Sequence, residues 1–402
     1  MKPYRQFLFL AFATRLALAF SFATYVMFLI SRGATLFEIS LINMSFMIAI
    51  ALAEIPTGIF ADLFGRKRSF LVSSLIMALG LLIYFFSGNF FLFVTAEVIT
   101  GIGMTFRSGA LEAWVVDAVA ESGDNITNDR IFSSEGIAKN AANIIGGLAG
   151  AYMGNIDLAY PWLAGAIVLV TVFIISAAIM REPARTIKVT IKSPFPAIKN
   201  ILIRSVDYGL RRKTVLFLML ATLVLSFFFQ PLNMYWQPRF SGLAGEKIWM
   251  LGWIWALISL SLMLGSYLVR RLPVTYNRRY ALVISVIFNS LPIIAAAIVI
   301  DFYVALSMFC LYEIARGFME PIQSAFINDE IPSSERATIL SLNQVFMRIG
   351  AIIGLLVTGM IAQETSITTA WIVAALIGLF AIPLFLLCRP SSNSKQAQIS
   401  DV

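Results

Sequence analysis

Twelve apolar runs decide which class of fold this chain can adopt. Each run holds roughly 20 residues, the length that an α-helix needs to cross the hydrocarbon core of a bilayer. The chain is 59% hydrophobic and 13% charged, whereas soluble domains carry about 25% charged residues. The sequence therefore predicts an all-α polytopic membrane protein with twelve transmembrane helices. We expect them at residues 7–30, 36–60, 69–87, 90–117, 131–154, 158–180, 214–236, 247–270, 279–299, 301–327, 337–362 and 366–388.

Basic residues are distributed unevenly between the segments that connect the runs. Most of the 30 Lys and Arg residues fall in segments on one side of the predicted bundle, whereas Arg32, Arg239 and Lys247 fall on the other. Cytoplasmic loops of membrane proteins carry such an excess of positive charge, so we expect both termini in the cytosol. This asymmetry also explains the net charge of +8 without a nucleic-acid partner.

The longest polar stretch, Arg181 to Lys213, divides the runs into two groups of six and contains nine Lys or Arg residues. Within it, Ala197–Leu210 alternates apolar and basic residues, which suits either a surface helix on an anionic leaflet or a solvated linker. We therefore expect four segments: an N-terminal six-helix half at 1–181, a basic cytosolic linker at 182–213, a C-terminal six-helix half at 214–390 and a cytosolic tail at 391–402.

The two halves share a pattern of polar residues. Arg107 and Asp117 in the fourth run correspond to Arg316 and Asn328 in the tenth run, and the two arginines are 209 positions apart. Transporters built from two such repeats bind their substrate near the bilayer midplane, at the interface of the repeats. The repeat therefore predicts two pseudo-symmetric six-helix halves around a substrate site.

A glycine-rich, basic turn follows the second run. The pattern G-x-x-x-D-x-x-G-R-K is formed by Gly58, Asp62, Gly65, Arg66 and Lys67. It resembles the loop signature of the major facilitator superfamily of transporters, and the sequence around it resembles a prokaryotic branch of drug and metabolite exporters. The resemblance implies a multi-pass, monomeric protein of the cytoplasmic (inner) membrane of a prokaryote, surrounded by the lipid bilayer.

The resemblance also implies a gate at the cytosolic ends of the helices. Asp62 is expected to face the start of span 11, where backbone N–H groups favour an anion. Arg66 is expected to pair with Asp117 at the end of span 4. The alternative is a tight turn that serves only as a topology signal.

Two departures from the exporter pattern weaken the expectation of proton antiport without changing the fold. In span 4, many exporters have Arg followed by Gln-Gly, whereas Arg107 is followed by Ser-Gly. In span 5, the antiporter pattern Gly-Pro-x-x-Gly-Gly is reduced to its terminal Gly146 and Gly147. These two glycines still allow close approach of helices.

Ionisable side chains within the runs are candidates for function, because an unpaired charge at bilayer depth costs several kcal/mol. The acids that we consider as proton carriers are Glu313, Glu320, Glu54 and Glu112. Another acid, Glu97, lies nearer the outer end of span 4. The polar and basic residues that we consider as lining the substrate cavity are Arg15, Arg107, Lys139, Asn143, Gln230, Asn233, Arg316, Gln344 and Arg348.

Span 10 carries the most informative group of charges. Glu313, Arg316 and Glu320 lie at positions i, i+3 and i+7, so all three occupy one face of a helix. Arg316 can pair with one acid and leave the other to take a proton, which favours Glu313 or Glu320 as the carrier. A purely structural ion pair between helices is an equal alternative.

Span 7 combines two prolines with aromatic residues. Pro231 and Pro238 predict a bent or broken outer half, in which Tyr235 and Trp236 line a pocket or belong to an interfacial aromatic belt. The chain has no histidine and two separated cysteines, so no transition-metal site or other cofactor is expected. Any proton step near neutral pH must then use a carboxyl group.

These features favour a secondary transporter that works by alternating access, with proton-coupled export of an amphipathic small molecule as the first hypothesis. Five basic side chains within the spans support an alternative, the import or export of an anionic or zwitterionic metabolite. A membrane-embedded enzyme is a remote alternative, because neither a nucleophile–base pair nor a phosphate-binding loop is visible. A receptor on the same fold is equally remote, since no sensory domain is attached.

Overall fold

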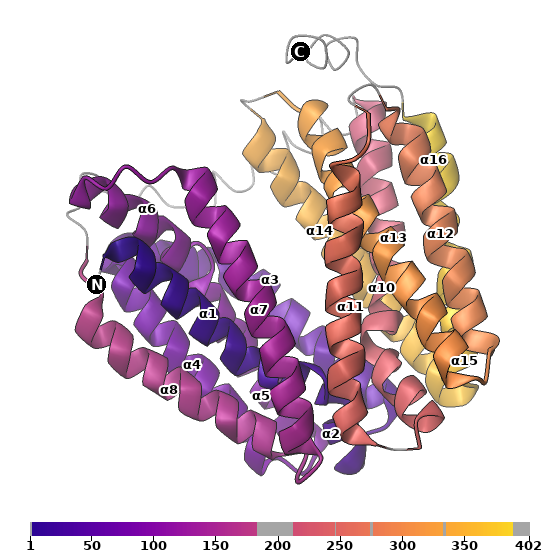
Figure 1. Cartoon of the computed structure of the whole chain (residues 1–402), viewed down its shortest axis with the longest axis horizontal. Helices are drawn as coiled ribbons and strands as arrows, with labels where there is room; N and C mark the ends of the chain where they lie inside the picture. The colour runs from indigo at the N-terminus through magenta and orange to yellow at the C-terminus, as the bar shows by residue number, and fades with distance from the viewer. Residues whose placement is uncertain (1, 183–211, 246, 274–275, 333–334, 389–402) are drawn as a thin grey trace. The chain divides into compact units, whose positions relative to one another are not determined.

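The computed structural model describes residues 2–182, 212–245, 247–273, 276–332 and 335–388 (Figure 1). Nearly all of these residues are helical. The predicted linker and its surface helix at Ala197–Leu210 lie almost entirely outside the described residues, as does the predicted tail at 391–402.

The helices form two compact units. Unit 1 comprises Met1–Thr190 and Ala244–Ser259, and unit 2 comprises Ile191–Leu243 and Leu260–Val402. The helices of unit 1 are α1 (Pro3–Phe22), α2 (Tyr25–Ser31), α3 (Leu36–Phe64), α4 (Arg66–Phe86), α5 (Phe90–Arg107), α6 (Ala110–Ser122), α7 (Asn128–Gly154) and α8 (Tyr160–Ile179). The first part of α11 (Ile248–Val269) also belongs to unit 1, and its second part belongs to unit 2.

The remaining helices belong to unit 2. They are α10 (Lys213–Leu243), α12 (Arg278–Ile298), α13 (Phe302–Asp329), α14 (Arg336–Glu364), α15 (Ile367–Gly378) and α16 (Ala381–Leu387). Within unit 2, α12 packs on α13 and α10 packs on α14; within unit 1, α1 packs on α7 and α4 packs on α5.

Eleven helical segments in the described part of the chain are long and apolar enough to cross a membrane. The remaining span, the fifth in chain order, is α7, whose hydropathy is lowered by Lys139, Asn140 and Asn143. The chain is therefore an all-α polytopic membrane protein with twelve transmembrane helices in two six-helix halves, and this confirms the fold class predicted from the sequence.

Three of the expected spans are interrupted. The first breaks at Ala23–Thr24, the fourth at Ser108–Gly109 and the twelfth at Leu379–Phe380. Gly109 adopts a φ of 72°, a left-handed conformation that glycine tolerates readily. The sequence predicted each of these spans as one continuous run.

Span 7 departs from its prediction in the opposite sense, because α10 continues through Pro231 and Pro238 without a break. Tyr235 and Trp236 are buried, so they do not form an exposed interfacial belt. Further along the helix, Phe240 packs edge-on against Phe309 of α13 at a centroid distance of 5.3 Å. Proline is tolerated within membrane helices where the surrounding protein satisfies the freed backbone groups.

Glycines permit the closest helix contacts in each unit. A Cβ atom on Gly150 of α7 would overlap the carbonyl oxygen of Phe20 in α1, and a Cβ atom on Gly350 of α14 would overlap that of Leu223 in α10. The two contacts occupy corresponding places in the two halves, so the internal repeat of the sequence is also present in the packing of the helices.

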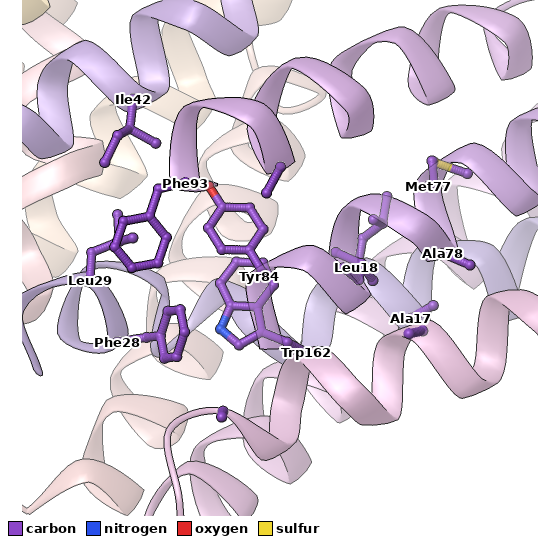
Figure 2. Close-up of a cluster of buried hydrophobic side chains, with 14 of the residues drawn as sticks. Ala17, Leu18, Phe28, Leu29, Ile42, Met77, Ala78, Tyr84, Phe93 and Trp162 are labelled. Carbon is purple, nitrogen blue, oxygen red and sulfur yellow. The ribbon is translucent and has the colours of Figure 1, made fainter. Parts of the chain in front are cut away.

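A buried hydrophobic cluster of unit 1 contains several aromatic side chains (Figure 2). The rings of Tyr84 and Trp162 stack at 4.0 Å with an interplanar angle of 16°. Phe28 of α2 and Phe93 of α5 pack edge-on at 5.9 Å. Aromatic pairs in these geometries add about 0.5–1.5 kcal/mol beyond the area that they bury, so they hold α2, α4, α5 and α8 together.

Candidate functional site

Gly65 joins α3 to α4 and brings the turn close to the end of α8. Its backbone has φ 112° and ψ 150°, a region that is almost restricted to glycine. The backbone N–H groups of Arg66 and Lys67 donate to the carboxylate of Glu182, at 2.8 and 3.0 Å. A carboxylate at the first turn of a helix is stabilised by the unpaired N–H groups and the helix dipole, so Glu182 fixes the start of α4.

The two basic side chains of the turn reach different partners. Arg66 pairs with the carboxylate of Asp117 in α6 and donates to the carbonyl of Ala113. Lys67 Nζ donates to the carbonyl oxygens of Ala177 and Met180 at the end of α8, at 2.8 and 2.6 Å. The structure thus brings Arg66 and Asp117 together, and it uses Lys67 as a cap for the carbonyl end of α8.

Gly58 and Asp62 lie on the exposed surface of α3 within unit 1. A Cβ atom on Gly58 would meet no atom within 4 Å. The partner that we expect for Asp62, the start of span 11, belongs to unit 2, so this contact stays a prediction.

Unit 2 has a matching ion pair at the corresponding turn. Arg278, the first residue of α12, pairs with Asp329 at the end of α13, and both this pair and Arg66–Asp117 are separated by 51 residues. The sequence repeat matched Asp117 with Asn328, and the structure corrects this by one position. Asn328 instead donates to the carbonyl of Ser324 in its own helix.

Lys139 is paired within unit 1. Its Nζ lies 3.5 Å from Glu112 of α6, and it also forms an ion pair with Glu135 one turn earlier on α7. Glu135 is buried, and the sequence missed it although its i, i+4 spacing from Lys139 could have identified it. Since Lys139 pairs with both Glu112 and Glu135, Glu112 belongs to a network of charged side chains.

Arg15 and Asn143 meet between α1 and α7. Arg15 Nε donates to Asn143 Oδ1 at 2.6 Å, and the guanidinium lies 4.8 Å from the ring centroid of Phe22. Arg107, the last residue of α5, lies close enough to Arg15 for the two charges to repel each other. Its Nε and Nη1 atoms are buried and have no hydrogen-bond partner among the described residues.

The charged group of span 10 is compact. Arg316 lies 3.4 Å from Glu313 and 3.2 Å from Glu320. It also donates to Asn233 Oδ1 at 3.1 Å and stacks over the Phe229 ring at 5.5 Å. The side chain of Glu313 is 3% exposed, whereas that of Glu320 is 55% exposed. One arginine thus faces two acids in unlike surroundings.

The other predicted site residues are less constrained by their contacts. Glu54 and Gln344 are exposed at the surfaces of α3 and α14, and Gln230 and Arg348 are half-buried. Glu54, Gln230 and Arg348 all make interactions with other groups.

Glu97 of α5 is a buried acid that the sequence did not select as a proton carrier. The residue is 7% exposed, and its carboxylate accepts a hydrogen bond of 2.6 Å from the Tyr25 hydroxyl. Tyr84 and Asn43 lie beside this hydroxyl, and no ion pair in the described residues includes Glu97. The signal in the sequence was a single acid in an apolar run, and the polar side chains around it come from three other helices, α2, α3 and α4.

No group of three His, Cys, Asp or Glu side chains in the described part of the chain is arranged to hold a metal ion. The charges lie instead at helix ends and inside two helical bundles. Two six-helix repeats with ion pairs at matching turns and charged side chains within the spans define a polytopic secondary transporter.

The chain belongs to the Major Facilitator Superfamily, whose family model matches residues 7–312 and 250–401. It is 23% identical to an MFS-type transporter, YxaM of Bacillus subtilis (strain 168), over 380 residues that cover 93% of each chain. Its fold resembles that of the nucleoside transporter NupG, with a TM-score of 0.83 at 15% identity, over 96% of this chain and 99% of that one. It also resembles a D-xylose-proton symporter, with a TM-score of 0.74 at 13% identity, over 96% and 99% of the two chains. The chain is a transporter and not an enzyme.

Proposed function

We propose that this transporter couples the export of an amphipathic small molecule to the uptake of protons across the cytoplasmic membrane of a prokaryote. The observation that carries the proposal is the Glu313–Arg316–Glu320 group of unit 2. Two carboxylates share one guanidinium within a membrane span, so the group bears one excess negative charge when both acids are ionised. Binding of one proton neutralises it, and an excess charge at this depth is unfavourable.

Glu313 is the better candidate for the proton-binding residue. Its side chain is buried, and its Oε2 atom has no hydrogen-bond partner among the described residues. Glu320 is largely exposed and accepts a hydrogen bond from Arg316 Nε. Protonation of Glu313 leaves Arg316 and Glu320 as a neutral, hydrogen-bonded pair, so the proton can leave and return without separating that pair.

The turns at Arg66 and Arg278 supply the second part of the mechanism. We infer that Asp62, Arg66 and Asp117 lock one end of the transporter in the outward-facing state, and that Arg278 and Asp329 do the same in the other half. Partly exposed ion pairs contribute about 0–1 kcal/mol each. Such weak pairs suit a gate that must open in every transport cycle.

The experiment is transport into proteoliposomes under an imposed pH gradient. The probes are amphipathic fluorophores of each charge type: ethidium as a cation, naphthalene-2-sulfonate as an anion and naphthalene-2-sulfonamide as a neutral molecule. We expect the gradient to drive accumulation of at least one probe by the native protein, and Glu313→Gln to abolish the pH-driven component.

Glu364→Gln is the matched control, because Glu364 is an exposed acid at the end of α14. Pure exchange of the probe at equal pH on both sides should survive in Glu313→Gln, since exchange requires no net proton movement. If Glu313→Gln and Glu320→Gln both transport like the native protein under the gradient, the proposed coupling site is wrong.

A further inference from the structure

Arg15 is held in place by a closed set of contacts in unit 1. Its Nε donates to Asn143 Oδ1, and its guanidinium covers the ring of Phe22. Phe22 packs edge-on against Trp255 at 5.7 Å, and Trp255 Nε1 donates to the carbonyl of Asn143 at 3.0 Å. Trp255 lies in the part of α11 that belongs to this unit. Arg15 is therefore positioned by Asn143 and Phe22, Trp255 contacts both of these residues, and none of the three carries a negative charge.

Arg107 adds a second positive charge close to the first. It ends α5 directly before the break at Ser108–Gly109, and it repels Arg15 electrostatically. Two of its guanidinium nitrogens are buried without a hydrogen-bond partner. A buried donor without an acceptor destabilises a protein, and a second like charge nearby adds to that cost.

The acids of the same unit do not neutralise these arginines. Glu112 and Glu135 both pair with Lys139, and none of the ion pairs among the described residues includes Arg15 or Arg107. Arg15 and Arg107 therefore keep their positive charges without a paired acid in the described part of unit 1. Natural proteins retain unfavourable arrangements of this kind mainly at functional sites.

We propose that Arg15 and Arg107 bind the anionic group of the transported molecule, and that Asn143 and Phe22 orient Arg15 for this contact. Guanidinium groups suit carboxylate, sulfonate and phosphate oxygens, because two parallel N–H donors match two oxygens. Phe22 and Trp255 place aromatic surface beside this pair of cations. The substrate class is therefore an amphipathic organic anion. This inference rests on the proposed function and specifies the charge of the amphipathic molecule that is exported.

Binding to purified protein in detergent micelles tests this site without any proton gradient, so failure of the proton coupling would not affect the result. The probes are naphthalene-2-sulfonate and the uncharged naphthalene-2-sulfonamide, which share the same ring system. We expect native protein to bind the sulfonate at least about tenfold more tightly than the sulfonamide, since hydrogen bonds to charged groups are the strong ones.

Substitution of the two arginines distinguishes a role in recognising the ligand's charge from a role in the stability of the protein. Arg15→Gln and Arg107→Gln should each weaken sulfonate binding by about tenfold or more, and leave sulfonamide binding within about twofold. The ligand-free Arg107→Gln protein should unfold at a higher temperature than native protein, because the repulsion and the unpaired donors are removed. An arginine with a merely structural role would lower that temperature.

Arg32→Gln is the matched control, because Arg32 also lies over an aromatic ring of unit 1, that of Phe28 at 5.6 Å, but at an exposed position. It should keep the native preference for the sulfonate. If Arg15→Gln does not fold, two other variants take its place: Arg15→Lys, which retains the positive charge, and Arg15→Met, which removes it. The lysine variant should then bind the sulfonate more tightly than the methionine variant. Equal binding of the two probes by native protein, or native sulfonate affinity in both glutamine variants, overturns the proposal.

Discussion

Replacing Gly65 by alanine tests the structural reasoning about the turn between α3 and α4. The backbone at Gly65 has φ 112° and ψ 150°, a conformation that costs a residue with a side chain about 1–3 kcal/mol. A Cβ atom at this position would lie 2.7–2.8 Å from the carboxylate atoms of Glu182. The substitution therefore strains the backbone and displaces a neighbouring side chain at the same time.

The second effect can be estimated from the contacts of Glu182. Its carboxylate accepts hydrogen bonds from the backbone N–H groups of Arg66 and Lys67. Each of these exposed bonds contributes about 1 kcal/mol to stability. With the backbone strain, Gly65→Ala should lower the free energy of unfolding by about 3–5 kcal/mol.

The assay is denaturant unfolding in detergent micelles, followed by tryptophan fluorescence. Gly58→Ala is the matched control, because Gly58 lies in the same helix and a Cβ atom there meets open space. Alanine is the better helix former, so Gly58→Ala should raise stability by about 0.5–1 kcal/mol.

The double variant Gly65→Ala/Glu182→Ala separates the two effects. It removes the overlap but keeps the backbone strain, so it should be less destabilised than the sum of the two single variants. A Gly65→Ala protein that unfolds like the native protein, or one that is no worse than Gly58→Ala, would refute the account of this turn.

Two further predictions concern the other polar contacts of unit 1. Tyr25→Phe should lower the free energy of unfolding by about 1–3 kcal/mol, because it leaves the buried Glu97 carboxyl without its donor; Tyr25→Phe combined with Glu97→Leu should recover part of this loss in the same denaturation assay. A double-mutant cycle of Arg66→Gln and Asp117→Asn should give a coupling energy below about 1 kcal/mol, because both side chains are partly exposed. A coupling of several kcal/mol would show that this pair is a permanent structural contact and not a gate.

The sequence predicted the parts of the fold that depend on local composition. The length and apolarity of each run determine where helices cross the membrane, and the fold class follows from them. The resemblance of the turn to the family's loop signature also implied that Arg66 and Asp117 would lie together, and the two side chains form an ion pair. The role of that contact in gating remains a prediction.

Features that depend on tertiary packing could not be predicted from the sequence. The break at Ala23–Thr24 lies within one apolar run, and nothing in the residues themselves marks it. Two prolines predicted a broken α10, but packing of its aromatic side chains keeps it continuous. The unneutralised state of Arg107 became visible only once the nearby acids were found to pair with Lys139.

Proton coupling through Glu313 is the central claim, and proton movement during transport measures it most directly. Vesicles with an acidic lumen that contains the pH indicator pyranine would receive whichever probe the transport assay identifies. We predict that probe addition raises the lumenal pH in vesicles with native or Glu364→Gln protein, and leaves it unchanged with Glu313→Gln. Uptake of the probe by the native protein without any change in lumenal pH would contradict the claim.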